Sequence, residues 1–471
     1  MQKTKIIATL GPSCFDKRII QQMCDKGLNV IRLNMSHITN ISNLKKQITM
    51  IRRVAKQSQR SIAIMMDLSG PKIRTTLPNH TQPILIKKNQ QYSLGFKSAD
   101  ILINANVSFS DINKKAAIKI DDGSISFSII KKTKNKLFIL ANNSGQIQHH
   151  KGVNFPGIKL NIPAVTVADK QSLELAIDLD VDWIAQSFVR NPKDIYPIKR
   201  ILSKHKIHIP VIAKIEKPEA IENLNTIIDQ YDGTLIARGD LGVEMNLSAL
   251  PKLQKQIINQ CIYHKKPCIV ATQMLESMIY SDSPTRAEVN DVANAIYDGV
   301  DAVMLSAETA TGKYPIQAVD MMSKIAHHIE SDLDISNFNR NIFDSTNQII
   351  HDNYIAICHA AHSISTTLDI KVIAVLTDSG KTAIQMAQFR PNATIVAITP
   401  FSKICNQLSM IWGVVPIHIN QPKNINKLYH MVNSTLIKRQ LIKKGDNFLL
   451  SSGNLKKIKH STNMLQIYKS S

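Results

Sequence analysis

The most regular feature of the chain is a series of short, almost entirely apolar segments rich in β-branched residues. Continuous apolar runs, unlike alternating ones, are typical of strands buried on both faces of a parallel sheet. Between most of them lie stretches with helical periodicity, such as residues 253–263 and 286–297. Eight such strand–helix units predict a TIM (β/α)8 barrel. The predicted strands are residues 5–10, 29–36, 61–68, 183–188, 210–216, 233–240, 267–274 and 301–308.

The interval between the third and fourth predicted strands is far too long for a single helix. Turn signals occur there at Asp122-Gly123 and Ser144-Gly145. The alternating pattern around them predicts strands at residues 84–86, 91–96, 125–130 and 136–140. We therefore expect a β-barrel cap domain at 71–162, inserted where barrel active sites lie, so that it can act as a lid.

After about residue 333 the chain has the pattern of another α/β unit. Strands are predicted at 372–376, 394–398, 414–417 and 448–451, with a helix at 424–439 among them. A length of 471 residues suits about three domains. The predicted fold is α/β, with a barrel formed by residues 1–70 and 163–333, the cap, and a C-terminal α/β domain at 334–471.

The net charge of +22, from 58 Lys and Arg against 36 Asp and Glu, raises the question of a nucleic-acid or membrane partner. The basic residues are scattered, however, and the dense cluster at 131–136 has no interleaved aromatic side chains. A coding bias toward Lys, Ile and Asn accounts for such a profile. We therefore expect neither a nucleic acid nor a membrane as partner.

The six cysteines and the N-terminal segment favour a cytoplasmic protein. No two cysteines form a C-x-x-C pair, so zinc ribbons and redox motifs are disfavoured and reduced, structural thiols are expected. Residues 1–10 lack the apolar core of a signal peptide, and no apolar run reaches the length that spans a bilayer.

Polar and charged residues follow the predicted barrel strands at the end where barrel enzymes carry their active sites. Two carboxylates, Glu216 and Asp240, suit a hard divalent cation, which oxygen ligands hold. The surrounding cations suit a phosphate, whose charge a transfer reaction must stabilise. This pattern indicates metal-assisted phosphoryl transfer; paired carboxylates also serve glycoside hydrolysis, but that reaction does not need the surplus cations. The cations are Arg32, Lys72, Arg74 and Lys214.

Nine segments in order along the chain resemble the pyruvate kinase family. They are TKIIATLGPS at 4–13, NVIRLNMSH at 29–37, MDLSGPKIRT at 66–75, KGVNFPG at 151–157, IAKIEKPEA at 212–220, ARGDLGVE at 237–244, ATQMLESM at 271–278, SPTRAEVNDVANA at 283–295 and MLSAETATGKYP at 304–315. The resemblance implies phosphoryl transfer from phosphoenolpyruvate to ADP, giving pyruvate and ATP, in glycolysis. It implies Mg²⁺ as cofactor, with Mn²⁺ as an alternative.

The resemblance also implies roles for single residues. Glu216 and Asp240 match the magnesium ligands, and Lys214 matches the lysine on the transferring phosphoryl group. Substrate binding and catalysis fall to Arg32, to Gly239 and Asp240 at the substrate carboxylate, and to Thr272 beside the enol carbon, as proton donor or organiser of a water. The residues that match the nucleotide side are Asn34, His37, Arg74 and Lys151.

A monovalent cation site, usually for K⁺, is implied by Asn34, Ser36, Asp67 and the carbonyl of Leu68. Members that depend on potassium tend to carry Glu where this chain has Lys72. A lysine ammonium has about the size and charge of K⁺ and attracts the same oxygens. We therefore expect Lys72 to fill this role and activity to be largely independent of added potassium.

In the C-terminal domain, the resemblance points to a phosphorylated effector and a homotetramer. A phosphate would suit the segment Thr377-Asp378-Ser379-Gly380-Lys381-Thr382, which follows a predicted strand and opens a helix. An ordinary capped helix start is the alternative. The loop at 451–463 lacks the family's usual glycine-rich sequence, so we expect phosphate affinity at 377–382 without the usual effector response.

Two other functions are compatible with part of the pattern. Another metal-dependent barrel enzyme acting on phosphoenolpyruvate or an enolate, such as a lyase, would not explain the cap with Arg74 and Lys151. A basic binding protein built on an inactive barrel would lack active-site groups, yet the matched residues are all present.

Overall fold

The computed structural model describes residues 2–38, 40–76, 83–105, 109, 112, 117–158, 160, 162–332, 353–419, 425–453 and 462–471. By its internal contacts the chain divides into two compact units. The first comprises Met1–Met66, Leu179–Ile184 and Ile258–Ser471, and the second comprises Asp67–Asp178 and Ala185–Ile257.

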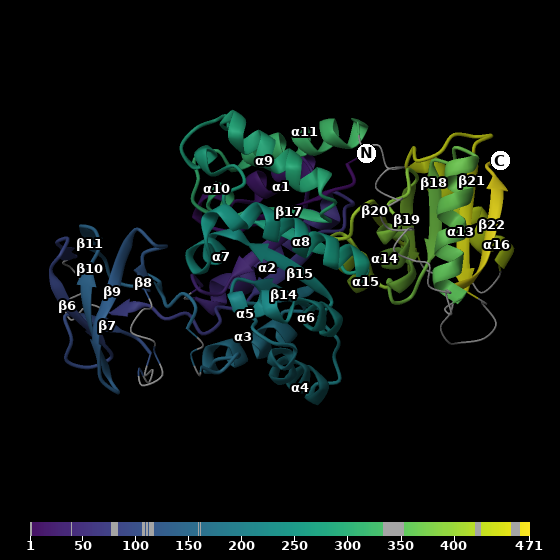
Figure 1. The fold of residues 1–471 in the computed structure, drawn as a ribbon. Coiled ribbons are helices and arrows are strands. Elements are labelled where there is room, and N and C mark those ends of the chain that lie inside the picture. The colour runs from purple at the N-terminus through teal and green to yellow at the C-terminus, as the bar shows by residue number, and fades with distance from the viewer. Residues whose placement is uncertain are drawn as a thin grey trace. The chain divides into compact units, whose positions relative to one another are not determined.

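Eight strands form a closed barrel in the order β1-β17-β16-β15-β14-β13-β3-β2, which confirms the predicted TIM barrel (Figure 1). Neighbouring strands such as β1 and β17 pair in parallel, and most of the strand residues are buried, as their apolar runs predict. The strands are β1 Lys5–Thr9, β2 Leu28–Asn34, β3 Ala63–Asp67, β13 Trp183–Gln186, β14 Val211–Ile215, β15 Gly233–Ala237, β16 Cys268–Ala271 and β17 Ala302–Leu305.

Each predicted barrel strand runs one to three residues past its observed carboxyl end, and in two of them the excess belongs to a helix. Residues 238–240 begin α7, and residues 307–308 begin α10. The apolar signal stops at residues 237 and 305, and an acidic residue in a first helical turn is favoured by the helix dipole. The helices of this region are α1 Lys17–Asp25, α2 Ile41–Gln57, α3 Val167–Asp178, α4 Tyr196–Lys204, α5 Pro218–Glu222, α6 Leu224–Gln230, α7 Arg238–Glu244, α8 Leu250–Tyr263, α9 Arg286–Tyr297, α10 Ala307–Ala310 and α11 Pro315–Asp332.

The inserted segment folds into strands, as predicted (Figure 1). A seven-stranded sheet has the order β12-β8-β9-β10-β6-β7-β4, and β11 pairs with β5. Apolar residues of both sheets and of the adjoining segments, including Phe109, Phe127 and Phe155, form one core. The strands are β4 Thr75–Thr76, β5 Ile84–Ile86, β6 Gln91–Gly95, β7 Ile101–Ile103, β8 Ala117–Ile120, β9 Ile125–Lys132, β10 Lys136–Ala141, β11 Gly145–Ile147 and β12 Val153–Asn154.

The C-terminal segment forms a five-stranded sheet in the order β20-β19-β18-β21-β22. The strand β22, which pairs antiparallel with β21, was not predicted. The elements are α13 Asn353–Thr367, β18 Val372–Leu376, α14 Lys381–Gln388, β19 Thr394–Thr399, α15 Ser402–Leu408, β20 Val414–His418, α16 Ile425–Lys438, β21 Asn447–Gly453 and β22 Thr462–Lys469. The domain boundaries at 70/71, 162/163 and 333/334 stay predictions, and the last lies outside the described residues.

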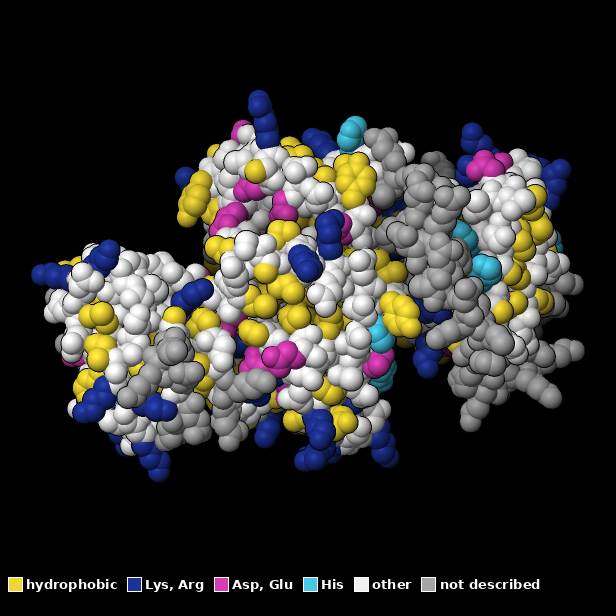
Figure 2. Space-filling view, in the orientation of Figure 1, with side chains coloured by type: hydrophobic (Ala, Val, Ile, Leu, Met, Phe, Trp, Pro, Cys, Tyr) yellow, Lys and Arg dark blue, Asp and Glu magenta, His cyan; other side chains and the backbone are white. Residues whose placement is uncertain are grey.

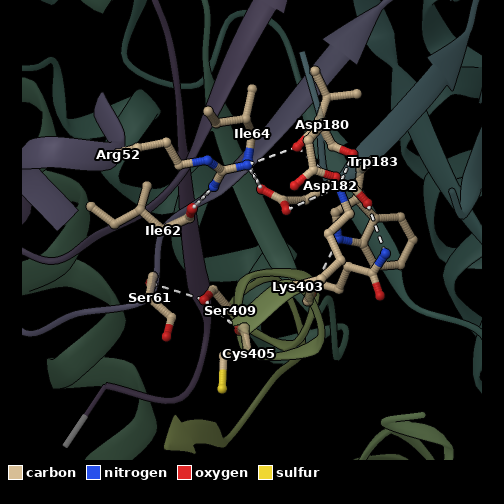
Figure 3. A network of polar contacts seen from close by, with 12 residues as sticks. Arg52, Ser61, Ile62, Ile64, Asp180, Asp182, Trp183, Lys403, Cys405 and Ser409 are labelled. Carbon is tan, nitrogen blue, oxygen red and sulfur yellow. Dashed lines mark hydrogen bonds and ion pairs between the residues drawn. The ribbon is translucent and has the colours of Figure 1, made fainter. Parts of the chain in front are cut away.

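Within the first unit, polar contacts join the start of β13 to α15 of the C-terminal segment (Figure 3). Asp182 is buried and accepts a 2.8 Å hydrogen bond from Arg52, while Lys403 Nζ lies 3.6 Å from its other oxygen. Burial raises the pKa of Asp182, and the Arg52 and Lys403 cations oppose that rise. The indole of Trp183 donates to the carbonyl of Gln407 at 3.1 Å. These contacts fix α15 against the barrel strand.

The remaining expectations concern thiols, membranes and surface charge. All six cysteines are buried and free, as expected. Among the described residues, no helix combines the length and apolar character that a membrane crossing requires. On the face shown in Figure 2, the Lys and Arg side chains are dispersed among other residues, in line with the scattered basic charge of the sequence.

Candidate active site

The ammonium of Lys214 is the centre of a buried polar cluster in the second unit. Lys214 lies near the carboxyl end of β14, and its side chain is 10% exposed. Its Nζ lies 2.9 Å from Glu216 Oε1 and 3.3 Å from Asp67 Oδ1, and it donates to Ser187 Oγ at 2.7 Å. The cluster fixes one positive charge at the strand end, where a barrel enzyme binds its substrate.

Glu216 is fully buried, and a backbone amide holds one of its carboxylate oxygens. Its Oε2 accepts a 2.7 Å hydrogen bond from the amide of Phe188. Its Oε1 forms an ion pair with the Lys214 ammonium at 2.9 Å. Burial raises the pKa of Glu216, the Lys214 ammonium opposes this, and the nearby Asp240 carboxylate adds to the rise. A buried carboxylate that faces a cation and a second carboxylate is suited to share in holding a divalent metal ion.

Asp240 lies in the first turn of α7, beside Gly239, and is partly exposed. Its Oδ1 accepts a 3.0 Å hydrogen bond from Lys72. Among the described residues, no group of three or more His, Cys, Asp or Glu side chains is placed to hold a metal ion. The charges of Glu216 and Asp240 interact, and Mg²⁺ is commonly held by one or two carboxylates together with substrate phosphates.

Lys72, which was expected at the monovalent cation site, lies beside Asp240 in the second unit. Its ammonium pairs with Asp240 and lies 5.9 Å from the centre of the Phe188 ring. Of the expected ligands in this unit, Asp67 faces Lys214, and the carbonyl of Leu68 accepts a 2.7 Å hydrogen bond from Ser187. The positive charge of Lys72 therefore lies beside a carboxylate of the candidate metal site.

The expected nucleotide residues of the cap, Arg74 and Lys151, lie on paired segments. Arg74 bridges to Gly152 and donates to the carbonyl of His150 at 3.1 Å. The ammonium of Lys151 pairs with Asp121 at 2.9 Å. Gly152 leaves room for Lys72, because an added Cβ would lie 3.1 Å from Lys72 Cε. The segment that carries Lys151 thus lies against the side chain of Lys72.

The first unit carries the other predicted substrate residues. Arg32 is buried on β2, and its guanidinium donates a hydrogen bond to Thr9 Oγ1 at 3.0 Å. Thr272 follows β16 with a φ of 69°, which is unusual for a β-branched residue, and its hydroxyl donates to the carbonyl of Ala271 at 2.6 Å. Such backbone strain is often found at functional sites.

The remaining predicted residues of this unit follow β2. Asn34 ends the strand, its side-chain oxygen accepts the amide of Ser36 at 3.2 Å, and its carbonyl accepts the amide of His37 at 3.1 Å. These bonds form a tight polar turn at the carboxyl end of β2. Its side chains are thereby presented at the same end of the strand as Arg32.

Sequence reasoning missed Ser187 and Phe188, which follow β13. Ser187 connects Lys214 to Leu68, and Phe188, with a φ of 56°, directs its amide to Glu216. The signal was the polar pair Gln186-Ser187, which directly follows the apolar residues 183–185. The same reasoning that singled out the other strand ends would have included it.

The segment 377–382 forms a compact helix start. Thr377 Oγ1 accepts the amide of Gly380 at 2.9 Å, and Gly380, with a φ of 79°, precedes α14. The hydroxyls of Thr382 and Thr462 share a 2.6 Å hydrogen bond, whereas Ser379 and Lys381 are exposed. Of the expected effector loop at 451–463, residues 454–461 lie outside the described residues.

Comparisons with known proteins agree with this geometry. The family model "Pyruvate kinase, barrel domain" matches residues 1–319, and "Pyruvate kinase, alpha/beta domain" matches residues 355–468. The pyruvate kinase of Thermotoga maritima is 37% identical, and that of Clostridium perfringens 35%, each match covering 100% of both chains. The crystal structure of a pyruvate kinase from Cryptosporidium parvum matches with a TM-score of 0.93 at 31% identity, covering 100% of this chain and 96% of that chain.

Proposed function

Because the chain belongs to the pyruvate kinase family, we propose that the cluster of Lys214, Glu216 and Asp240 is the centre of its phosphoryl transfer site. The chain is an enzyme that transfers a phosphoryl group from phosphoenolpyruvate to ADP, giving pyruvate and ATP. The observation that carries the assignment is the ion pair between the buried Lys214 ammonium and Glu216 Oε1 at 2.9 Å, with the Asp240 carboxylate nearby.

Glu216 and Asp240 would hold Mg²⁺, with Mn²⁺ as the alternative. The family generally uses Mg²⁺ and K⁺. The donor set fits Mg²⁺, because two carboxylates leave further positions for oxygens of the substrate and water. When bound, Mg²⁺ supplies positive charge that neutralises oxygens of the phosphoryl group. The Phe188 amide would keep the Glu216 carboxylate turned toward the site.

Lys214 would act on the transferring group through its fixed ammonium. The charge at Nζ offsets negative charge on the phosphoryl oxygens and on the leaving enolate oxygen. Ser187, Asp67 and Glu216 hold Nζ in place, so little reorganisation is needed during the reaction.

Arg32, Gly239, Asp240 and Thr272 complete the substrate site in this proposal. Arg32 binds the substrate phosphate, and the backbone at Gly239 and Asp240 receives the substrate carboxylate. Thr272 serves protonation of the enolate, either directly or through a water that its hydroxyl orients. Arg74 and Lys151 from the cap, with Asn34 and His37 after β2, bind the nucleotide phosphates.

Activity is expected to be independent of added potassium because Lys72 supplies a fixed charge beside Asp240. Rates in Na⁺, K⁺ or a large organic cation should agree within about twofold. The Lys72→Glu variant should be activated by K⁺ about tenfold or more, since a carboxylate there attracts a cation and a lost electrostatic contact costs at least that factor. Initial rates at fixed ionic strength measure both.

Lys72→Gln is the control for this experiment. It removes the ammonium without adding a carboxylate, so its rate should fall with a smaller recovery in K⁺ than Lys72→Glu shows. A many-fold activation of the unaltered enzyme by K⁺ would contradict the proposed role of Lys72.

The segment Thr377–Thr382 would bind a phosphorylated ligand weakly, without shifting the activity. The exposed Ser379 and Lys381 at the start of α14 offer a hydroxyl and an ammonium. We expect sugar phosphates and AMP to leave the phosphoenolpyruvate saturation curve unchanged. A shift of its midpoint by any of them, lost in Lys381→Ala, would instead establish an effector site.

The reaction itself is tested by pyruvate formation from phosphoenolpyruvate and Mg²⁺, with and without ADP. A pyruvate kinase requires ADP, whereas a lyase that acts on phosphoenolpyruvate does not.

The family is typically tetrameric and usually cytoplasmic, and we propose a homotetramer in the cytoplasm for this chain. Sedimentation or light scattering measures the assembly.

A further inference from the structure

A buried carboxylate outside the proposed catalytic set joins three parts of the second unit. Glu244 is the last residue of α7, and its side chain is 1% exposed. Its Oε1 accepts a 2.6 Å hydrogen bond from Lys217 Nζ and a 2.7 Å hydrogen bond from Asn154 Nδ2. A buried carboxylate costs free energy unless its partners compensate for lost water, so these two contacts define its position.

Each partner lies next to a residue with a proposed role. Lys217 directly follows Glu216, and Asn154 on β12 comes three residues after Lys151. Glu244 itself lies four residues after Asp240, about one turn along the same helix. One carboxylate oxygen therefore links the segments that follow both candidate metal ligands with the cap strand β12, which Lys151 precedes.

Two further contacts run beside this junction. Lys119 of the cap donates to the carbonyl of Val243 at 2.7 Å, so the cap holds the end of α7 at two points. The ammonium of Lys217 lies 5.8 Å from the centre of the Phe188 ring, and the amide of Phe188 donates to Glu216. The cation over that ring restrains the residue that orients Glu216.

We propose that Glu244 is a positioning residue, which holds cap strand β12 against α7 through Asn154 and so keeps Lys151 in place for the nucleotide. The inference rests on the proposed role of Lys151. Glu244 acts through Lys217 and through the backbone that leads from Asn154 back to Lys151. Its loss weakens nucleotide binding more than the chemical step.

The Asn154→Ala variant tests this directly, because it frees the cap strand and leaves the Lys217–Glu244 ion pair intact. We expect the KM for ADP to rise about three- to tenfold, the range of one lost hydrogen bond, with kcat and the KM for phosphoenolpyruvate within about twofold. The matched control is Asn143→Ala. Asn143 bonds Ser124 and Ser126 within the cap, and its loss should leave the KM for ADP unchanged.

Two variants of Glu244 complete the experiment. Glu244→Ala should raise the KM for ADP at least as much as Asn154→Ala, and the double variant should be no worse than Glu244→Ala, because both remove the same contact. Glu244→Gln keeps an acceptor oxygen and should restore most of the ADP affinity. If Glu244→Ala does not fold, the KM values for ADP of Asn154→Ala and Glu244→Gln still test the positioning role of Glu244.

A Lys151→Met variant distinguishes failure of the proposed nucleotide role of Lys151 from failure of the positioning role of Glu244. If Lys151→Met raises the KM for ADP and Asn154→Ala does not, the positioning role of Glu244 is overturned alone. If Lys151→Met leaves that KM unchanged, the proposed role of Lys151 fails and the inference fails with it. Additive effects of Asn154→Ala and Glu244→Ala would also overturn it.

Discussion

Replacing Lys214 with methionine is expected to lower kcat about 10³-fold, the upper range for removing one preorganised stabilising group. Methionine fills similar space but has no charge to offset the phosphoryl and enolate oxygens. Because the ammonium acts on charge that develops during transfer, kcat should fall more than the KM for phosphoenolpyruvate rises. ADP-dependent pyruvate formation under steady-state conditions measures the change.

Folding must be followed in the same variant, because Lys214 neutralises two buried acids. Its ammonium lies 3.3 Å from Asp67 and 2.9 Å from Glu216. Removing one partner of a buried ion pair costs about 3–5 kcal/mol. Lys214→Arg keeps the charge and relieves this cost, yet its planar fork cannot place charge at the position of Nζ. We expect Lys214→Arg to fold and to remain strongly impaired.

Lys5 provides a matched buried lysine on another barrel strand. It begins β1, is 4% exposed and donates to the carbonyl of Val414 at 2.8 Å. Burial lowers the pKa of Lys5 to about 8. Since it lies at the start of its strand, Lys5→Met should cost stability and leave kcat within about twofold. Native turnover in a folded Lys214→Met would refute the role of Lys214.

The barrel strands could be predicted because their signal is local. Each is a continuous apolar run, and each prediction overlaps its observed strand while running one to three residues past the carboxyl end. The short strands β4, β7, β8, β11 and β12 were missed, and so was the eight-residue strand β22. A strand of two to four residues carries too little pattern, and its formation depends on partners distant in sequence.

The candidate site was predictable as a set of positions but not as a set of contacts. The carboxyl ends of barrel strands identified Lys214, Glu216 and Asp240. The pairing of Lys72 with Asp240 depends on side-chain rotamers and on the room left by Gly152, which no local pattern reveals. The same holds for Glu244, whose partners come from segments 90 and 27 residues away.

The Glu216→Gln variant is expected to separate metal binding from stability. Glutamine preserves the shape and can still accept the Phe188 amide, but it removes the negative charge. The half-saturating Mg²⁺ concentration should rise about tenfold or more, and kcat at fixed Mg²⁺ should fall about 10²-fold or more, because a cation site loses a full charge. Initial rates over a Mg²⁺ titration measure both quantities.

Stability should change little in Glu216→Gln, because two opposing effects nearly cancel. The variant no longer buries a carboxylate whose pKa burial has raised, but it loses the ion pair with Lys214. A net change of about 1 kcal/mol corresponds to a Tm shift of no more than about 4 °C.

Glu288→Gln is a control in which stability should change and the Mg²⁺ response should not. Glu288 accepts hydrogen bonds from Thr285 in the capping box of α9, so its replacement should lower Tm and leave the Mg²⁺ titration unchanged. A Glu216→Gln enzyme with the native Mg²⁺ response would exclude Glu216 as a ligand.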